Sequence, residues 1–439
     1  MTLVDRFRAH LASLSLQPGR AIVAVSGGPD SMALLDLLAR THADHRLELA
    51  VAHVDHGIHP ASSQARRAVE RAALDRGLPF DAEVLELGAV ATETAARVAR
   101  YAALERIRVR RAADWILLAH HADDQVETVL MRVLRGSGPA GLAGMSARRG
   151  RLVRPLLPFR REELAQYLRD GGIAAWTDAA NADPRHLRSW IREDVLPRIQ
   201  ERLVDVRGAL ESVGRQASRN REAWRQVLDQ LPGLDVEQEA SGISVAAPVL
   251  AGYDSELATE IVRTLGRQAG CVIGEVRAER LLALARGGES GRSVPLGAGW
   301  RGELAFGRLR IVPDTGLAPS PVSLSGHAGE LRWGRWRLRV RQAAAPERQE
   351  RRGMTAWFAD PELTVRGPRA GERLAPLGGR GRRLLVRCFQ DAQVPRGERG
   401  SWPVLEVAGT AIWVPGVCRA AALIPPAGSE AWRVDVTHE

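Results

Sequence analysis

Hydrophobic and polar positions alternate between two patterns along the first 200 residues. Short apolar runs indicate buried strands, and stretches with apolar residues three or four positions apart indicate amphipathic helices. The expected strands are Ala21–Val25, Leu47–Val54, Phe80–Leu85 and Trp115–Ala119, and the expected helices are Ser31–Arg40, Ser62–Arg76, Thr92–Arg111 and Asp123–Leu134. This alternation predicts an α/β fold with a doubly wound parallel sheet, which binds ligands beyond the carboxyl ends of its strands.

The pattern changes after residue 205, which we take as the end of the first domain. Residues 206–231 predict a charged linker helix, with Val206, Leu210 and Val213 at helical spacing. Residues 232–312 predict a small helical or α+β middle domain. Residues 313–329 are rich in Pro, Gly and Ser and are typical of a linker. Residues 330–439 alternate between apolar and polar positions and predict a small sheet-rich C-terminal domain.

Composition narrows the class of protein. The formal net charge of this 439-residue chain is +10, and all 62 basic residues are arginine because the sequence contains no lysine. A basic surface favours a polyanionic partner, with nucleic acid first. Cys271, Cys388 and Cys418 lie far apart without a CxxC pair, which disfavours a disulfide framework or a zinc ribbon. Apolar runs fall short of the about 20 residues that a membrane helix needs, and the first residues do not resemble a secretory signal, so we expect a cytoplasmic protein without a membrane partner.

The candidate chemistry begins at the corner after the first expected strand, where the sequence reads SGGPDS (26–31). Gly27 and Gly28 allow a sharp turn and a close approach to a ligand, and the next helix starts with free N–H groups that favour an anion. Ser26 and Ser31 add hydroxyl donors, and Asp30 fits this place if it holds a Mg²⁺ ion that bridges to phosphates. The corner therefore predicts a phosphate site without lysine, and a tight capped turn is the structural alternative.

One further string lies at the carboxyl edge of the expected sheet, and a pair of arginines lies on a later expected helix. HVDHGIHP (53–60) places His53, Asp55 and His56 at the end of the second strand, near the predicted nucleotide. Farther along, Arg97 and Arg100 are three residues apart and share one helix face. A satisfied histidine-rich loop and a solvated charged helix are the structural alternatives.

The string HHADDQVET (120–128) follows the fourth expected strand and opens a helix. Asp124 and Glu127 lie one turn apart there. One of these carboxylates could help hold Mg²⁺, and another could take a proton from an attacking amine. Ordinary acidic capping of the helix is the structural alternative.

Taken together, these strings resemble a known family. SGGPDS resembles the PP-loop of ATP pyrophosphatases, which cleave ATP to AMP and pyrophosphate. The strings that follow it resemble, in order, the tRNA(Ile)-lysidine synthetases: HVDHGIHP, ARVARYAAL, AHHADDQVET, LRGSGPAGLAGM, RPLLPFRREEL and DAANADPRHLRSWIREDVLP. GRSVPLGAGW and VRGPRAGERLAPLGGRGRRLL are similar to the later domains of that family. His59, Ser189 and Glu372 depart from the family, where Arg, Asn and Asp are usual.

The resemblance implies an enzyme that adenylates the 2-carbonyl of the wobble cytidine in an isoleucine tRNA with a CAU anticodon. The ε-amine of free L-lysine then displaces AMP. Implied catalytic residues are Asp30, Arg97, Asp124 and Glu127, with Asp30 also the ligand of Mg²⁺. Implied ATP-binding residues are Ser26, Gly27, Gly28, Pro29, Asp30, Ser31 and His53. Implied tRNA or lysine contacts are Asp55, His56, Arg100, His121, Arg135, Gly136, Arg188, Arg192, Arg373 and Arg383. A homodimer is compatible with the family.

Some alternatives stay open from the sequence. Trp333 and Trp336 offer stacking faces for RNA in the C-terminal domain, and they fit an apolar core equally well. A tRNA cytidine thiolation enzyme would share the PP-loop but needs cysteines, and residues 1–270 contain none. A small-molecule amide synthetase would bring an ammonia source. A non-catalytic RNA-binding protein would not need the carboxylates of the strings above.

Overall fold

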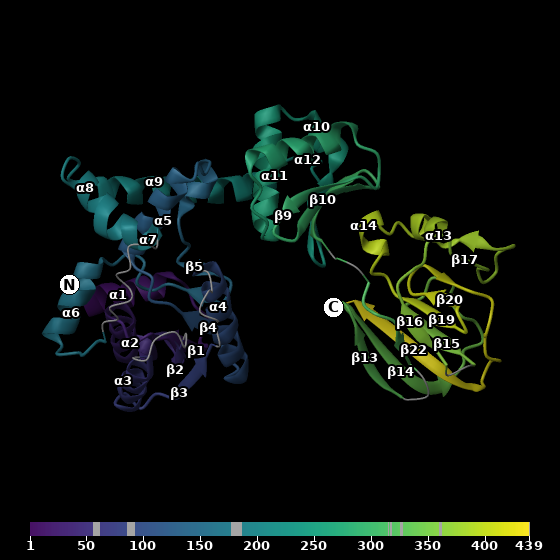
Figure 1. The fold of residues 1–439 in the computed structure, drawn as a ribbon, viewed down its shortest axis with the longest axis horizontal. Coiled ribbons are helices and arrows are strands. Elements are labelled where there is room, and N and C mark those ends of the chain that lie inside the picture. Colours follow the sequence, from purple (N-terminus) through teal and green to yellow (C-terminus); the bar gives the residue numbers. More distant parts are fainter. Residues whose placement is uncertain are drawn as a thin grey trace. The chain divides into compact units, whose positions relative to one another are not determined.

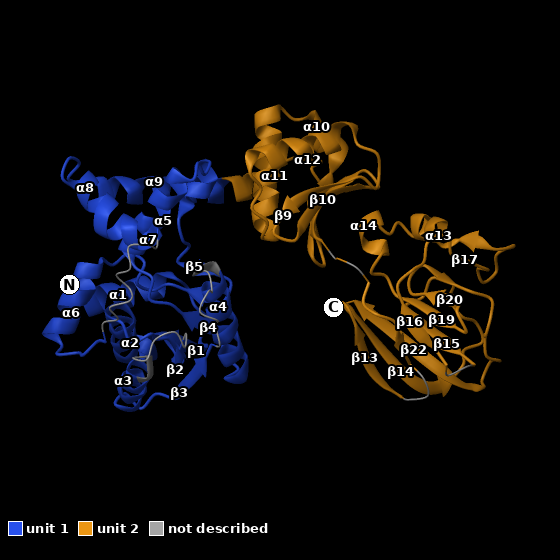
Figure 2. Cartoon of the chain, viewed as in Figure 1, with its two compact units in different colours: residues 1–223 blue, residues 224–439 orange. Residues whose placement is uncertain are grey.

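The computed structural model describes residues 1–55, 62–85, 93–176, 187–314, 316, 318–324, 328–359 and 362–438. The chain forms two compact units, residues 1–223 and residues 224–439 (Figure 2). Within the described ranges, no helix is both long and apolar enough to cross a membrane. The finer domain boundaries expected at residues 205, 231, 312 and 329 stay predictions.

A six-stranded sheet forms the centre of the first unit, with strand order β3-β2-β1-β4-β6-β5 (Figure 1). All neighbouring strands pair in parallel except β5 with β6. The chain builds from β1 outward to β3 and then returns to the other side of β1 with β4, so the switch point of the sheet lies between β1 and β4. The strands are β1 (Gly19–Ala24), β2 (Leu47–Asp55), β3 (Phe80–Val84), β4 (Trp115–Leu117), β5 (Arg148–Arg149) and β6 (Leu152–Val153).

Helices cover both faces of this sheet because successive strand residues point to opposite sides. Val23 of β1 packs in one apolar cluster with Leu34 of α2 and Val69 of α3. Its neighbour Ile22 packs in the opposite cluster with Leu104 of α4. The helices around the sheet are α1 (Leu3–Ser13), α2 (Pro29–Thr41), α3 (Ser62–Leu74), α4 (Glu93–Arg110), α5 (Ala122–Leu134) and α6 (Arg161–Asp170), with the short 3₁₀ helices η1 (His42–His45) and η2 (Pro139–Ala143).

A helical segment packs against α5 and completes the first unit. It consists of α7 (Leu187–Trp190), the π-helical turn η4 (Ile191–Val195) and α8 (Leu196–Gln200), followed by the long helix α9 (Val206–Leu228). Ile191 and Leu196 are buried against Val126 of α5. Gly214 of α9 lies so close that a Cβ there would be 3.0 Å from the Val129 side chain of α5. Helix α5 is therefore held from two sides.

The strands and helices expected in residues 1–134 are all present, and the predicted doubly wound α/β fold is confirmed. The differences are confined to the ends of elements. Helix α2 begins at Pro29, two residues before the expected start, because proline suits the first helical position, where its missing N–H costs nothing.

The second unit begins with a five-stranded sheet of order β7-β8-β11-β10-β9, on which α10, α11 and α12 pack. Two further sheets follow, with orders β12-β16-β19-β20-β21 and β13-β14-β22-β15, and β17 pairs with β18. The strands are β7 (Glu237–Glu239), β8 (Gly242–Ala246), β9 (Ser293–Gly297), β10 (Trp300–Ala305), β11 (Arg308–Pro313), β12 (Val322–Ser323), β13 (Gly329–Trp333), β14 (Trp336–Ala344), β15 (Thr355–Phe358), β16 (Thr364–Arg366), β17 (Arg373–Leu374), β18 (Arg383–Leu384), β19 (Val404–Val407), β20 (Thr410–Val414), β21 (Cys418–Arg419) and β22 (Glu430–His438). The helices are α10 (Ala247–Gly252), α11 (Ser255–Ala269), α12 (Glu275–Gly287), α13 (Leu385–Asp391) and α14 (Arg396–Arg399).

Two expectations for this unit differ from the structure. The segment expected as a linker contains strand β12, because Val322 pairs with Val365 and the next residue but one, Leu324, is buried. Trp333 and Trp336 are 1% and 2% exposed, and their indole N–H groups donate to backbone carbonyls of the same unit. Both tryptophans are therefore core residues, and a stacking role for them is wrong.

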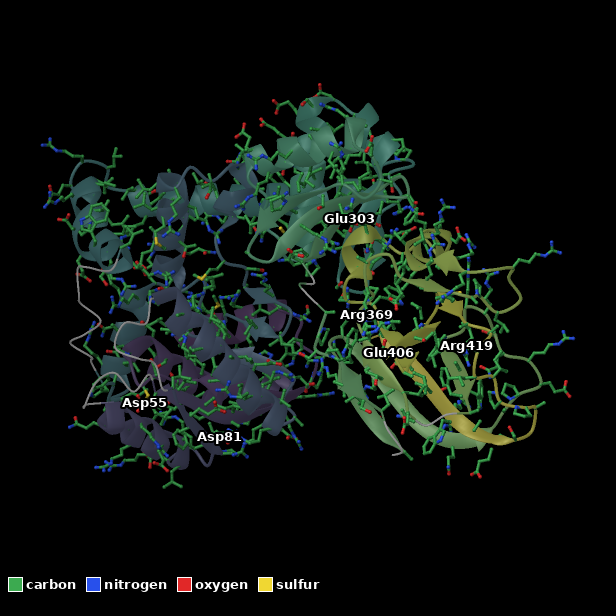
Figure 3. The ribbon with its side chains drawn as sticks, turned by 45° about the vertical axis from the view of Figure 1, so that its right-hand side comes forward. Asp55, Asp81, Glu303, Arg369, Glu406 and Arg419 are labelled. Atoms are coloured by element: carbon green, nitrogen blue, oxygen red, sulfur yellow. The ribbon has the colours of Figure 1, made fainter. Side chains whose placement is uncertain are left out.

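Arg366 is a buried charge of the second unit that is paired with opposite charges. It is ion-paired with both Glu372 and Glu406, and Arg369 Nη1 lies 3.1 Å from Glu406 Oε2 (Figure 3). Burial opposes ionisation of Glu372, but hydrogen bonds from Arg366 and from the Arg369 backbone lower its pKa. Glu372, at a position where the family usually has Asp, therefore still supplies a carboxylate to the buried guanidinium of Arg366.

Candidate active site

The candidate site lies at the switch point of the sheet in residues 1–223. The SGGPDS corner follows β1, and the HHADDQVET string follows β4, the strand that pairs with β1 in parallel. The carboxyl ends of parallel neighbours open at the same edge of a sheet. The topology therefore brings the two strings together from positions about ninety residues apart in the chain.

The corner after β1 is shaped by its own hydrogen bonds. Gly27 has φ +94°, a left-handed conformation that glycine adopts without strain. The buried Ser31 hydroxyl donates to the Gly28 carbonyl at 2.8 Å and accepts from the Ser26 N–H at 3.2 Å. Pro29 opens α2 directly after this turn. The first N–H groups of α2 and the exposed Ser26 side chain therefore face the edge of the sheet as donors for an anion.

His121 connects the corner to helix α5. Its Nε2 lies 3.5 Å from Asp30 Oδ2 and 3.6 Å from Asp124 Oδ2, and its Nδ1 lies 3.6 Å from Asp123 Oδ2. The ring is 2% exposed. Burial opposes protonation, but the three carboxylates outweigh it and raise the pKa of His121 to about 10. His121 is therefore a buried cation that ties Asp30 to the start of α5.

Asp30 keeps one carboxylate oxygen for a further cation. Its Oδ1 is buried and has no hydrogen-bond partner among the described residues. An unpaired buried carboxylate oxygen suits a divalent ion. Within the described ranges, no three His, Cys, Asp or Glu side chains form a group that could hold a metal. The donor set thus fits Mg²⁺, which uses one or two protein carboxylates with substrate phosphates, better than a closed zinc site.

Asp123 fixes the framework of the site. It accepts from the Arg161 backbone N–H at 2.9 Å, at the start of α6, and its Oδ1 lies 2.6 Å from Arg207 Nη1 of α9. Burial raises its pKa, but the contacts with His121, Arg161 and Arg207 outweigh that effect and lower it. Asp124 caps the same helix by accepting from the His121 backbone N–H at 3.1 Å.

Two arginines, Arg188 and Arg192, contact the carboxylate of Glu127. It is 1% exposed, and Arg192 contacts both of its oxygens, at 2.6 and 3.1 Å. Arg188 Nε lies 3.4 Å from Glu127 Oε2, and Arg188 also donates to Thr128. Burial raises the pKa of Glu127, and the attraction of Arg192 only partly offsets this effect. Arg188 and Arg192, expected as substrate contacts, thus lie against a carboxylate of α5.

A group of arginines borders these carboxylates. Arg97 and Arg100 of α4 lie over the ring of Tyr101, with distances of 5.2 and 5.8 Å from Cζ to the ring centroid. His120 lies next to them, and burial, together with the charges of Arg154, Arg100 and Arg97, lowers its pKa to about 3 against the opposing attraction of Asp124. His120 is therefore neutral at physiological pH.

The remaining predicted residues lie at different distances from this centre. His53 is buried in β2, and its Nδ1 hydrogen-bonds to the Val25 carbonyl at 2.8 Å, while Asp55 ends the same strand (Figure 3). Burial lowers the pKa of His53. His56 lies outside the described residues. Arg135 and Gly136 are exposed at the end of α5.

Arg373 and Arg383 lie in the second unit, on the paired strands β17 and β18. Arg373 is exposed, and Arg383 Nη2 lies 2.9 Å from Asp391 Oδ2. These two residues therefore belong to the second unit.

Sequence reasoning missed two parts of the site. Tyr101 and Arg154 lie near the predicted Arg97 and Arg100, and Asp123, which had no predicted role, contacts His121 and Arg207. The string RPLLPFRREEL contained the signal for Arg154, because it follows an apolar pair, Leu152–Val153, that forms strand β6 beside β4.

Comparison with known proteins assigns this architecture to a family. Residues 3–199 match the PP-loop domain, and residues 363–436 match the TilS substrate C-terminal domain. The chain is 34% identical to the tRNA(Ile)-lysidine synthase of Symbiobacterium thermophilum, over 98% of this chain and 96% of that one. It is 36% identical to the tRNA(Ile)-lysidine synthase of Alkalilimnicola ehrlichii, over 90% and 89%.

Among solved structures, a TilS C-terminal domain is similar at 25% identity and a TM-score of 0.24, over 27% of this chain and 98% of that one. The similarity to the synthases runs through both units, and the three cysteines of the chain are buried in the second unit. A thiolation enzyme is therefore not favoured. The chain belongs to the tRNA(Ile)-lysidine synthase family of PP-loop enzymes.

Proposed function

We propose that this protein uses ATP to join free L-lysine to the 2-position of the wobble cytidine in an isoleucine tRNA with a CAU anticodon. The ring carbonyl is first adenylated with release of pyrophosphate, and the ε-amine of lysine then displaces AMP. The observation that carries the proposal is the convergence at the β1–β4 switch point of the SGGPDS corner and the carboxylates of α5, in a chain similar to lysidine synthases over nearly its whole length.

ATP is proposed to bind at the corner Ser26–Ser31. The backbone N–H groups at the start of α2 and the hydroxyls of Ser26 and Ser31 would donate to phosphate oxygens. The free oxygen of Asp30 would hold Mg²⁺, which when bound neutralises phosphate charge. His121 keeps Asp30 oriented by contacting its other oxygen. His53 and Asp55 would border the nucleoside from β2.

Lysine arrives with its ε-amine protonated, so the site must attract a cation and accept a proton. Asp124 is the better candidate for this role. Its side chain is 14% exposed, whereas Glu127 is 1% exposed and both of its oxygens face arginines. We assign proton acceptance to Asp124, and we assign to Glu127 the positioning of Arg192, whose Nη2 also lies 3.6 Å from Asp124 Oδ1.

The second unit is proposed to bind tRNA through its arginines. Arg373 is exposed within the matched C-terminal domain and offers a guanidinium group for a backbone phosphate. Arg135 and Gly136, at the exposed end of α5, are proposed to contact RNA near the anticodon. A homodimer and a cytoplasmic location stay predictions.

The test is a ligation assay with the full chain. Protein, ATP and tRNA are mixed with and without lysine, and the tRNA mass is measured. The proposal expects a gain of one lysine less one water, only when lysine is present and only on a tRNA with a CAU anticodon. An unchanged tRNA mass in the presence of lysine would overturn it, and incorporation of sulfur would favour the thiolation alternative.

A further inference from the structure

Three arginines surround one phenol ring next to the carboxylates of the site. Arg97 and Arg100 lie over the Tyr101 ring, and Arg97 Nη2 donates to the phenol oxygen at 3.3 Å. Arg154, at the end of β6, lies near the same phenol, because Tyr101 raises the pKa of Arg154 against the larger, lowering effect of burial. Arg154 is 6% exposed. We call these three residues, with Tyr101, the Tyr101 cluster.

The charges of the Tyr101 cluster are not balanced. Among the described residues, neither Arg97 nor Arg100 nor Arg154 is ion-paired with a carboxylate, and the buried Nε of Arg154 has no hydrogen-bond partner. Burial lowers the pKa of both Arg100 and Arg154, and neighbouring guanidinium charges lower it further. Buried like charges without a counter-charge cost stability.

Two other buried arginines, Arg310 and Arg419, have more partners than Arg154. Arg310 contacts Glu239, Glu303 and Glu398, and Arg419 donates to five backbone carbonyls. Among the described residues, Arg154 in contrast donates to a single carbonyl, that of Ser146 at 2.8 Å. Three neighbouring guanidinium groups without a carboxylate partner, one of them buried, indicate that the missing negative charge comes with a ligand.

The position of the cluster points to the reacting substrates. β6 pairs in parallel with β4, so Arg154 leaves the sheet at the edge where His120 and the acidic start of α5 leave it. His120 lies within the electrostatic reach of both Asp124 and the three arginines. The cluster thus borders the carboxylates without being neutralised by them.

We propose that Arg97, Arg100 and Arg154 bind a phosphate group, with Arg154 as a binding residue and Tyr101 as the spacer that holds the three forks apart. The inference rests on the proposed function. Three cations match a multiply charged phosphate better than a singly charged carboxylate, and guanidinium forks bind phosphate oxygens in pairs. The phosphate comes either from the pyrophosphate part of ATP or from the RNA backbone at the wobble nucleotide.

The test measures binding in two arms with the full chain. One arm titrates inorganic pyrophosphate by calorimetry, and the other measures tRNA binding at several salt concentrations. The variants are R154M and R100M. The matched control is R106Q, because Arg106 lies on the same helix α4 but is 58% exposed and paired with Glu83.

We expect both variants to raise the Kd about 10-fold in one arm, and R106Q to leave both arms unchanged. A rise confined to pyrophosphate assigns the cluster to ATP. A rise confined to tRNA, with the slope of log Kd against log salt reduced by about 1, assigns it to the RNA backbone. Unchanged Kd values in both arms for a folded R154M or R100M would overturn the proposal.

Two controls separate this proposal from others. The wild-type protein is assayed for lysine ligation in parallel, so a failure of the proposed function appears there and a failure of the cluster appears only in the binding arms. Thermal unfolding of each variant without ligand is also recorded. A purely structural role predicts a lower midpoint with unchanged Kd for the folded fraction, which would also contradict a phosphate site.

Discussion

Arg192 forms two hydrogen bonds with Glu127: its Nε donates to Oε1 at 2.6 Å, and its Nη2 donates to Oε2 at 3.1 Å. The pair joins the middle of α5 to the helical segment of residues 187–200. Glu127 is 1% exposed, so its charge depends on Arg192 for compensation. This carboxylate is therefore part of the framework that orients its neighbour Asp124.

Removal of the arginine tests that relationship. R192Q leaves the buried Glu127 charge with only Arg188 beside it, and we expect a loss of about 3 kcal/mol in the free energy of unfolding. Urea unfolding measures the loss. The double variant E127Q/R192Q removes both charges and should be more stable than R192Q alone. A double variant no more stable than R192Q would contradict the charge argument.

Asp124 and Glu127 should differ in their effect on chemistry. D124N removes the proposed proton acceptor, and we expect lysine transfer to slow by about 100-fold while pyrophosphate release from ATP persists. E127Q should slow both steps, because it disturbs the arginines around the site. Quenched-flow measurement of pyrophosphate for the first step, and of AMP and tRNA mass for the second, separates the steps. Unchanged transfer in both variants would refute the roles given to these carboxylates.

The helix behind the PP-loop carries a pH-dependent contact. Asp36 of α2 is buried and accepts from the Tyr167 hydroxyl, from Arg76 and from Arg40. Burial raises its pKa, but these donors outweigh burial and lower it below the ordinary 3.8. A lowered carboxyl pKa contributes stability above pH 3.8 that disappears as the pH falls through the folded-state pKa.

We therefore expect D36N to lose about 2 kcal/mol at pH 7 and progressively less below pH 3.8. Urea unfolding at a series of pH values measures the difference from wild type. D44N is the control, because Asp44 forms an exposed ion pair with Arg8 and should show no measurable change. An Asp36 effect that stays constant down to pH 2 would contradict the assigned pKa direction.

The buried tryptophans should report on stability and not on RNA. W333A removes a side chain that is 1% exposed and contacts the core of the second unit, so we expect a loss of about 3–5 kcal/mol. The affinity of the folded variant for tRNA should match wild type, measured by filter binding below its unfolding midpoint. A tRNA affinity of the folded W333A variant below that of wild type would instead support stacking of an RNA base on Trp333.

The arginines of β17 and β18 give an electrostatic prediction. Arg373 is exposed, whereas Arg383 is already paired with Asp391. If Arg373 contacts a phosphate, R373Q should lower tRNA affinity and reduce the salt slope by about 1. R383Q should have the smaller effect. Equal salt slopes for wild type and R373Q would exclude Arg373 from the RNA contact.

The sequence was most informative where patterns are local. The strands around the SGGPDS corner are readable because each is a continuous apolar run, and Pro29 with two glycines marks the turn that follows β1. The family resemblance then supplied candidates in every motif. Pairings between distant residues could not be read, and Arg192 with Glu127 is one of them, because ion pairs leave no periodic signal.

Arg154 shows why part of the site escaped prediction. Strand β6 has two residues, which is too short for an alternating pattern, so the residue after it was not placed at the edge of the sheet. Trp333 and Trp336 escaped for another reason, because an apolar ring on a basic strand suits both a core and a nucleic-acid surface. Burial in the three-dimensional fold decides between them.

The central claim is that the corner after β1 directs cleavage of ATP between its α and β phosphates to activate an RNA base. The most direct test follows ATP labelled at the α phosphate with wild-type protein, the tRNA and lysine, beside a D30N variant. The account predicts labelled AMP that forms only with the tRNA and is strongly reduced in D30N. Labelled ADP as the product, or AMP formation unaffected by D30N, would contradict it.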